Sequence, residues 1–383
     1  TRDLRDLDGD EAWQWDSSAN REIFENMRIR RDRADERSAF MIAGIVANHV
    51  ISAVHALWLN KKAGNSSAHK QQRAVRRRPP AIFLQLLMKP STFLITGASG
   101  FLGSHLMQQC QPDDCLGIYH ANRPPDDGRA YLQFDLSDTD ALLRHLQKSP
   151  PKYLIHCAAK INIDWCEKNP DMCWRINAEL PVTLAKACAE IGCKFVFVSS
   201  DMVFDGEKGD YTESDAVNPI SHYGRAKAAA ESGVLQAHAG AIVARVALIY
   251  GLPVSNGRGG SFLTWILQRL AAGLPVPLFD DQYRTPVEVT ELAATLLKLA
   301  RSDFHGVIHI AGAEKNDRYT FGKYVCRFTG YDEKLLQKVS FRSGLNDVLR
   351  PRDLSMRTDL LQKMIGHQLS DCASALQRIL SAK

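Results

Sequence analysis

The sequence predicts an α/β fold: a doubly wound parallel sheet with a smaller C-terminal α/β lobe and an N-terminal helical appendage. From residue 91 onward, short apolar runs alternate with helix-like segments, which is typical of a parallel sheet with crossover helices. The run FVFV at 195–198 is apolar without interruption, as expected for a strand buried on both faces. Another apolar run, at 93–95, leads through a glycine-rich turn into a helix-like segment.

The glycine-rich turn has the sequence GASGFLG over 97–103. Its first glycine permits a tight turn, its second lets the backbone approach a pyrophosphate, and its third lets the helix pack close to the strand. The start of the following helix offers N–H groups and the positive end of the helix dipole to a phosphate. We therefore predict a Rossmann-like dinucleotide site; a glycine-rich turn without a ligand is the alternative. The predicted cofactor contacts in the turn are Gly97, Ser99, Gly100, Phe101 and Leu102.

The same alternation places the remaining elements. Strands are expected at 93–95, 116–119, 131–134, 153–157, 194–199 and 241–248, and helices from 104, after 138, over 172–191 and after 221. Beyond Gly251 the alternation weakens, and we expect the smaller lobe there, with a helix over 288–301 and a strand over 307–310. The predicted domains are an appendage over 1–87, a dinucleotide-binding domain over 88–251 and a mainly substrate-binding lobe over 252–383.

The appendage differs from the rest of the chain. Residues 39–59 contain no Asp, Glu, Lys or Arg, and this length is enough to span a bilayer. Polar residues such as Asn48 and His49 dilute the segment, however, and polar groups are costly inside a membrane. A membrane-spanning helix and a buried or interfacial helix both stay open. So does a fused or read-through segment ahead of a start at Met88. The basic, polar stretch at 65–80 is interpreted as a solvated linker, with contact to anionic lipid or nucleic acid as the alternative.

Charge and cysteine content limit the function classes. The net charge is only +5, and much of the basic density lies upstream of Met88, so we expect no nucleic-acid partner. The nine cysteines are an odd number without a CxxC pair, which predicts no metal site and no disulfide framework. This cysteine usage is typical of a reducing compartment, and we expect the cytoplasm.

Two further patterns suggest catalytic groups. Tyr223 and Lys227 are four residues apart, which places both on one face of a helix. A nearby ammonium lowers the pKa of a phenol and makes it a usable acid at neutral pH. Ser200 and Asp201 follow the strand predicted at 194–199, and ligands of open parallel sheets bind outside the carboxyl ends of the strands. A serine there can hydrogen-bond a substrate carbonyl. A surface Tyr–Lys pair and a capping serine are the alternatives.

Taken together, these patterns resemble the extended short-chain dehydrogenase/reductase superfamily, and within it the dTDP-4-dehydrorhamnose reductases. The resemblance covers about 91–366. The matching stretches are ITGASGFLG at 95–103, CAA at 157–159, INAE at 176–179, SSDMVFDG at 199–206, YTESD at 211–215, NP at 218–219, YGRAK at 223–227, RTP at 284–286 and RPRDLS at 350–355. The VFDG run followed by the tyrosine motif is fairly specific to this family and its near relatives.

The resemblance implies that the chain reduces a 4-keto nucleotide sugar with NAD(P)H. Tyr223 would protonate the oxygen that becomes the hydroxyl group, and Lys227 would lower the tyrosine pKa and hold the nicotinamide ribose. Ser200 would bind the keto oxygen, and Asn177 would complete a proton relay or support the active site. The other implied residues are Ala158 and Ala159 along the cofactor groove, Asp135 and Leu136 near the adenine, and Asp201, Arg284 and Arg350 near the sugar nucleotide. A guanidinium group suits phosphate or a base edge; for the two arginines a structural role is the alternative.

The sequence departs from the family pattern in two places. Met202 replaces the aromatic residue that usually follows the Ser/Thr-Asp pair, so we expect an altered substrate pocket. After the second predicted strand there is no acidic residue to bind a ribose 2′-hydroxyl, whereas His120 and Arg123 could accept a 2′-phosphate. We therefore expect NADP rather than NAD.

Other functions stay open. A nucleotide-sugar epimerase or 4,6-dehydratase is one. The dehydratases of the superfamily that the chain resembles have a Thr-Asp-Glu pattern at the site of Ser200, however, and Met202 stands at the third position here, which argues against dehydration. A non-catalytic, NADP-binding regulatory subunit is another, because the β subunit of methionine adenosyltransferase resembles the same family and carries a Ser-Ser-Asp stretch. The expected partner is a small nucleotide sugar; a homodimer and a membrane contact of the appendage stay open.

Overall fold

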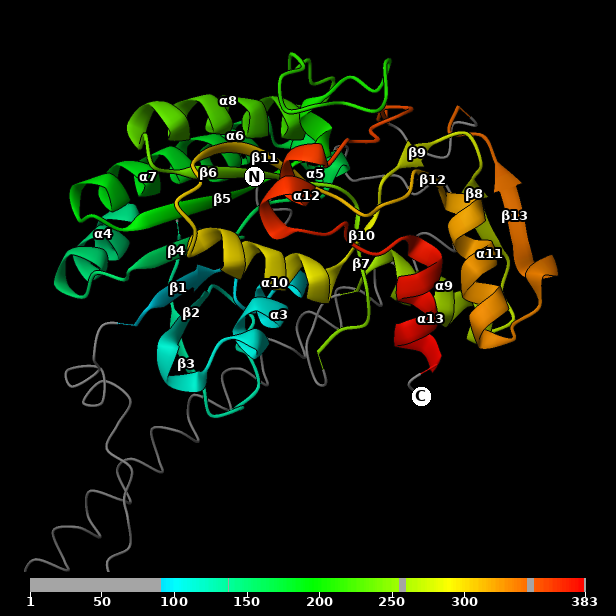
Figure 1. The fold of residues 1–383 in the computed structure, drawn as a ribbon, viewed down its shortest axis with the longest axis horizontal. Helices are drawn as coiled ribbons and strands as arrows, with labels where there is room; N and C mark the ends of the chain where they lie inside the picture. Colours follow the sequence, from blue (N-terminus) through cyan, green and yellow to red (C-terminus); the bar gives the residue numbers. More distant parts are fainter. Residues whose placement is uncertain (1–90, 137, 255–259, 343–347, 382–383) are drawn as a thin grey trace, which may run out of the picture. The chain divides into compact units, whose positions relative to one another are not determined.

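The computed structural model describes residues 91–136, 138–254, 260–342 and 348–381 (Figure 1). The appendage predicted over 1–87, with its uncharged segment at 39–59, lies outside these residues. Among the helices that are described, none combines the length and the apolar character that a membrane crossing needs.

The core of the fold is a parallel sheet of seven strands in the order β11-β6-β5-β4-β1-β2-β3. The strands are β1 (Phe93–Thr96), β2 (Cys115–Tyr119), β3 (Ala130–Gln133), β4 (Tyr153–His156), β5 (Lys194–Ser200), β6 (Ile242–Val246) and β11 (Gly306–Ile310). The chain runs outward from β1 to β3 on one side and from β4 to β11 on the other. This reversal opens a crevice at the carboxyl ends of β1 and β4. The predicted doubly wound sheet is confirmed.

Helices cover both faces of the sheet (Figure 1). Alternate residues of each strand point to opposite faces, so Phe195 and Phe197 pack on one side while Val196 packs on the other. The first face carries α4 (Thr139–Lys148), α7 (Leu180–Glu190) and α8 (His222–Ala237). The second carries α3 (Phe101–Gln109), α10 (Val289–Ala300) and α12 (Asp359–Ile365). Burial on both faces explains why the strands are continuous apolar runs.

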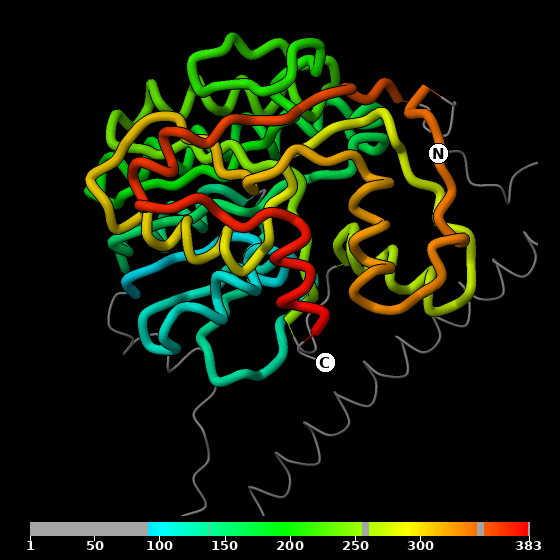
Figure 2. The backbone as a smooth tube through the Cα atoms, turned by 45° about the vertical axis from the view of Figure 1, so that its right-hand side comes forward, coloured from blue at the N-terminus to red at the C-terminus, as the bar shows by residue number. Residues whose placement is uncertain are grey.

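A smaller lobe has its own apolar core, which includes Tyr250 and Phe321. Its main elements are α9 (Phe262–Ala271), β8 (Val276–Phe279), α11 (Arg318–Thr329), β13 (Leu336–Val339) and α13 (Cys372–Ser381). Short strand pairs connect it to the sheet: β7 (Ile249–Tyr250) with β10 (Val287–Glu288), and β9 (Tyr283–Arg284) with β12 (Asn316–Asp317). The segment after 348 runs from the lobe back over the sheet to α12 and then to α13 (Figure 2).

The helix and strand expected in the lobe at 288–301 and 307–310 are present, but they are part of the domain built on the seven-stranded sheet. α10 packs against α3, and β11 pairs with β6 as the edge strand. The predicted boundary at 251 therefore does not separate two continuous domains, because 289–310 returns to the first one.

The helix predicted over 172–191 is also interrupted. It consists of α6 (Pro170–Trp174), a π-helical turn (Arg175–Glu179) and α7, and it is preceded by α5 (Ile163–Lys168). The wider turn holds Asn177, which is buried. π-Turns within helices are frequent at functional sites. Short 3₁₀ turns occupy Pro112–Asp114, Asp201–Val203 and Glu333–Leu335.

Candidate functional site

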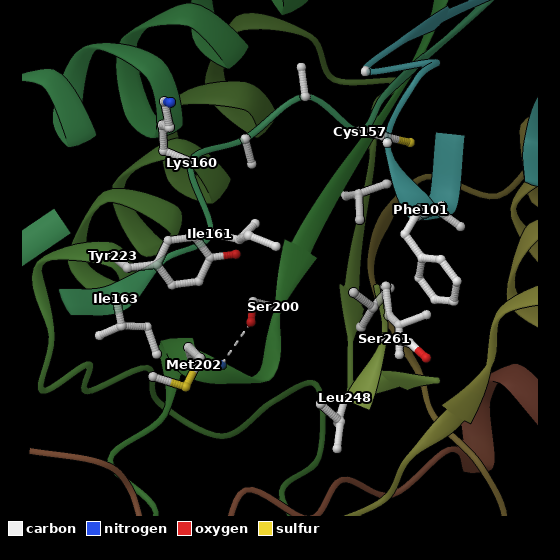
Figure 3. Close-up of a pocket in the computed structure, with 18 of the residues that line it drawn as sticks. Phe101, Cys157, Lys160, Ile161, Ile163, Ser200, Met202, Tyr223, Leu248 and Ser261 are labelled. Carbon is white, nitrogen blue, oxygen red and sulfur yellow. Dashed lines mark hydrogen bonds between the residues drawn. The ribbon is translucent and has the colours of Figure 1, made fainter. Parts of the chain in front are cut away.

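One cavity of about 1100 Å³ lies along the carboxyl ends of the strands and extends to the lobe (Figure 3). In the view of Figure 3, Tyr223 and Met202 lie on one side of it and Phe101 and Ser261 on the other. Most of the predicted site residues line this cavity: Gly97, Ser99, Gly100, Phe101, Leu102, His120, Asp135, Leu136, Ala158, Ala159, Ser200, Asp201, Tyr223, Lys227, Arg284 and Arg350. Arg123 and Asn177 are not among its lining residues.

The glycine-rich turn between β1 and α3 is closely packed. Gly97 has a φ of 71°, and a Cβ there would lie 2.9 Å from the backbone nitrogen of Ala158. A Cβ on Gly103 would lie 2.1 Å from the carbonyl oxygen of Gly97. The first turn of α3 has no acidic residue, and its N-cap Gly100 has no side chain to satisfy the N–H groups. The turn therefore fits the pyrophosphate of a dinucleotide.

At the other end of the predicted cofactor groove, His120 follows β2 and Asp135 follows β3. Nε2 of His120 lies 3.7 Å from Oδ2 of Asp135. Arg123 is exposed on the same loop as His120. The region thus places a carboxylate beside the histidine, which the sequence reasoning did not anticipate. The choice between a 2′-hydroxyl and a 2′-phosphate stays a prediction.

The three predicted catalytic residues come from two adjacent elements. Ser200 ends β5, and its hydroxyl donates to Oδ1 of Asp201 at 3.0 Å. Tyr223 and Lys227 lie on α8, which begins after Ser221, whose hydroxyl accepts from the Gly224 N–H at 3.1 Å. Tyr223 and Ser200 direct their hydroxyl groups toward the same part of the cavity (Figure 3).

The protonation of Tyr223 differs from the sequence expectation. Burial raises the pKa of the phenol above its ordinary value, and hydrogen bonding with Ser200 only partly opposes this rise. The expected lowering was wrong for this structure, because burial outweighs the groups that lower the phenol pKa, and Lys227 is not among those groups. The lysine Nζ donates instead to the carbonyl oxygen of Val198 at 2.6 Å. A raised pKa keeps the phenol protonated at neutral pH, which is the state that a proton donor needs.

Lys227 is itself strongly affected by its surroundings. Burial lowers the pKa of its ammonium group to about 7, while the Glu231 carboxylate acts in the opposite direction. Nζ lies 3.9 Å from the ring centroid of Phe197, in a cation–π contact. A small change of nearby charge can therefore change the protonation of this lysine near neutral pH.

Asn177 acts on the backbone of the cavity wall. Its Oδ1 accepts from the Lys160 N–H at 3.0 Å, and its Nδ2 donates to the Lys160 carbonyl oxygen at 3.0 Å and to Cys173 Sγ at 3.3 Å. Lys160 lines the cavity. Of the two roles considered from the sequence, these contacts favour support of the site.

Among the residues that the structure describes, three arginines line the cavity at the lobe: Arg284, Arg318 and Arg350. Nε of Arg284 lies 3.4 Å from Oδ2 of Asp201, and Arg350 Nη2 donates to both carboxylate oxygens of Asp164 at 2.9 and 2.8 Å. Arg318 donates from Nε to the amide oxygen of Gln282 at 3.2 Å. Nη1 of Arg350 is buried without a hydrogen-bond partner.

Sequence reasoning missed Arg318. It begins α11 after the capping residue Asp317 and belongs to no recognisable motif. Burial and the positive charge of Arg284 lower the pKa of its guanidinium to about 9. A cluster with this excess of positive charge favours an anionic ligand.

Comparison with known proteins supports one family. The protein-family model described as the RmlD substrate binding domain matches residues 91–383 of this chain. A probable low-salt glycan biosynthesis reductase of Haloferax volcanii is 31% identical over 293 residues, which are 75% of this chain and 97% of that protein. A dTDP-4-dehydrorhamnose reductase of Mycobacterium tuberculosis is 34% identical over 256 residues, 64% of this chain and 78% of that protein. The methionine adenosyltransferase 2 subunit beta of Bos taurus is 30% identical over 235 residues, 59% of this chain and 68% of that protein.

Solved structures agree with this fold. A dTDP-4-dehydrorhamnose reductase ortholog from Clostridium acetobutylicum superposes with a TM-score of 0.66 at 27% identity, over 76% of this chain and 98% of that one. A dTDP-4-dehydrorhamnose reductase from Bacillus anthracis, in complex with NADP, gives a TM-score of 0.67 at 24% identity, over 77% and 100%. The chain therefore belongs to the RmlD substrate binding domain family, as the sequence resemblance predicted.

Proposed function

We propose that this chain catalyses the NAD(P)H-dependent reduction of a 4-keto nucleotide sugar to the corresponding alcohol. The observation that carries the proposal is the continuity of the cavity. It passes from the glycine-rich turn, past Ser200 and Tyr223, to the three arginines of the lobe. The names of the reductase relatives from Haloferax volcanii and Mycobacterium tuberculosis support the same reaction class.

Different residues of the chain have different roles in the proposed reaction. Gly97, Gly100 and the start of α3 would hold the cofactor pyrophosphate, and Lys227 would hold the nicotinamide ribose. The bound cofactor would supply a hydride to the carbonyl carbon. The Ser200 hydroxyl orients the keto oxygen, and the Tyr223 phenol donates its proton to that oxygen as the C–H bond forms. The carbonyl thus gains one hydride and one proton and becomes a hydroxyl group.

The substrate end of the cavity suits a nucleoside diphosphate. Arg284, Arg318 and Arg350 provide planar guanidinium donors, which match phosphate oxygens. Phe262 and Trp265 also line the cavity, with ring centroids 6.1 Å apart and an interplanar angle of 15°. Aromatic faces of this kind suit a nucleobase.

For the cofactor we propose NADP over NAD. No acidic residue follows β2 directly, and His120 offers a donor to a 2′-phosphate. The preference would appear as a higher kcat/KM for NADPH than for NADH, reduced in His120→Ala. Equal values for both cofactors in the unmodified chain would contradict it.

The identity with methionine adenosyltransferase 2 subunit beta favours a second candidate, a non-catalytic regulatory subunit. One experiment separates the two. The full-length chain is mixed with NADPH and then with dTDP-linked and other 4-keto-6-deoxy sugar nucleotides, while nicotinamide absorbance is recorded. Oxidation that depends on the sugar is the expected result. Tight NADPH binding without oxidation by any of these sugars, together with stable binding to a methionine adenosyltransferase catalytic subunit, would replace the reductase by the regulatory function.

A further inference from the structure

A buried carboxylate lies one helical turn beyond Lys227 on α8. Glu231 is only 4% exposed. Its Oε1 accepts from the Ser199 hydroxyl at 2.5 Å, and its two carboxylate oxygens accept from Nε and Nη2 of Arg245 at 2.8 to 3.1 Å. Every oxygen of the carboxylate is thus occupied by a donor. Glu231 does not line the cavity, so a direct contact with substrate is not its role.

The ion pair between Glu231 and Arg245 is also held in place by a contact of Arg245 with a neighbouring strand. Nη1 of Arg245, on β6, lies 3.4 Å from Nε2 of His309 on β11. Burial lowers the pKa of His309 to about 4, so the ring is neutral at neutral pH. The contacts assign the tautomer: Nε2 accepts from Arg245, and Nδ1–H donates to the Arg357 carbonyl oxygen at 3.2 Å. Arg245 therefore has a fixed position against which Glu231 is held.

Two of the contacts around Glu231 lead to the predicted catalytic groups. Ser199 immediately precedes Ser200, and because strand residues alternate in direction, anchoring Ser199 on the α8 side directs Ser200 to the other side. Lys227 and Glu231 are four residues apart on one helix face. Lys227 in turn bonds the Val198 carbonyl oxygen, so α8 holds β5 at two successive residues.

We propose that Glu231 is a positioning residue for the reduction: through Ser199 and Arg245 it fixes the end of β5 that presents Ser200 and the turn of α8 that follows Lys227. The inference rests on the proposed function for its kinetic readout. The titratable groups that act on Lys227 in the described part of the chain are Glu231, Cys157 and Cys173, and both His156 and Tyr223 lie nearby. Burial lowers the pKa of His156 to about 3, and the pKa values of Cys157 and Tyr223 are raised. Of the neighbouring groups that raise the Lys227 pKa, Glu231 has the largest effect.

The test compares three single variants of the full-length chain. In Glu231→Gln the Lys227 pKa is expected to fall, so the decline of kcat/KM with rising pH begins about one pH unit lower. In Ser199→Ala kcat is expected to fall about tenfold without a shift of that decline, since one hydrogen bond is lost. Glu288→Gln is the matched control: Glu288 is also a buried carboxylate, which caps α10 outside the cavity. It should lower the melting temperature and leave the pH profile unchanged.

A buried arginine left without its partner can prevent folding. The double variant Glu231→Gln/Arg245→Met removes both charges and keeps the side-chain volume, and it should show the same shift. A readout independent of catalysis is the melting temperature measured as a function of pH. As the pH rises, the buried Lys227 loses its proton in the folded protein, and the melting temperature starts to rise at that pH. This onset should also move to lower pH in both Glu231 variants. A folded Glu231 variant with an unshifted onset would overturn the inference. Absence of sugar reduction in every protein, with the onset shifted, would instead overturn only the proposed function.

Discussion

Lys227 donates a hydrogen bond from its buried ammonium group to the carbonyl oxygen of Val198 at 2.6 Å. The bond connects α8, which carries Tyr223, to β5, which carries Ser200. The proposed proton donor and the group proposed to orient the keto oxygen are thus held on two elements joined by a charged hydrogen bond. Bonds of this type are among the stronger ones in proteins. The predictions below follow from this arrangement.

Tyr223→Phe removes the proposed proton donor and leaves the ring in place. Turnover is expected to fall by about 10²–10⁴-fold, which is the usual contribution of a general acid. NADPH affinity, measured by nicotinamide fluorescence, should change little, because the phenol contributes one contact among many. Tyr250→Phe is the matched control, since that ring is buried against Phe321 outside the cavity lining. Unchanged turnover in Tyr223→Phe would contradict the proposed mechanism.

Lys227→Met should stabilise the protein while it inactivates it. Burial lowers the Lys227 pKa from 10.5 to about 7, so the unfolded state binds the proton more tightly than the folded state. Between about pH 7 and 10.5 the unfolded chain carries more protons, and stability from this group therefore rises with pH over that window. At pH 6 the buried charge is fully present. Thermal melts should show a higher melting temperature for Lys227→Met than for the unmodified chain at pH 6, with a difference that narrows above pH 7.

Gly103→Ala should impair cofactor binding, because the added methyl group would lie 2.1 Å from the Gly97 carbonyl oxygen. The glycine-rich turn and α3 would have to separate, and overpacking of this kind costs about 1–3 kcal/mol. Gly192→Ala serves as the comparison, since its added methyl meets open space although its φ is 68°. Isothermal titration with NADPH should show at least a tenfold weaker affinity for Gly103→Ala only. Equal affinities in the two variants would place the pyrophosphate elsewhere.

Arg318→Gln should weaken the sugar nucleotide and spare the chemistry. Loss of one phosphate-pairing guanidinium costs about 1.5–3 kcal/mol, which corresponds to a rise of KM of roughly tenfold or more, with kcat nearly constant. The control is Arg378→Gln, which removes a half-exposed ion pair with Glu291 outside the cavity. Kinetics at varied sugar nucleotide measure the effect. If kcat falls and KM stays constant, the arginine acts on the reacting centre and not on the phosphates.

The sequence was sufficient to predict what local patterns determine. Strands buried on both faces appear as apolar runs, and the glycine-rich turn carries its geometry in its own residues. Three features depend on packing between distant segments and were not predictable in this way. β11 returns to the edge of the sheet beside β6, Arg318 reaches the cavity from the lobe, and the π-turn at Asn177 interrupts a helix that looks continuous in sequence. The sequence predicted a lowered pKa for Tyr223, and this prediction was wrong. The direction of the shift depends on burial, which the four-residue spacing to Lys227 does not reveal.

The central claim is that this cavity delivers a hydride to the keto carbon of a nucleotide sugar. The most direct test is isotopic. The full-length chain is incubated with NADPH deuterated at the transferable position and a dTDP-4-keto-6-deoxy sugar, and the product is analysed by NMR and mass spectrometry. The account predicts one deuterium on the former keto carbon, with incorporation about 10²–10⁴-fold slower when Tyr223→Phe replaces the unmodified chain. Deuterium that stays on the cofactor, or that appears at another carbon, would contradict it.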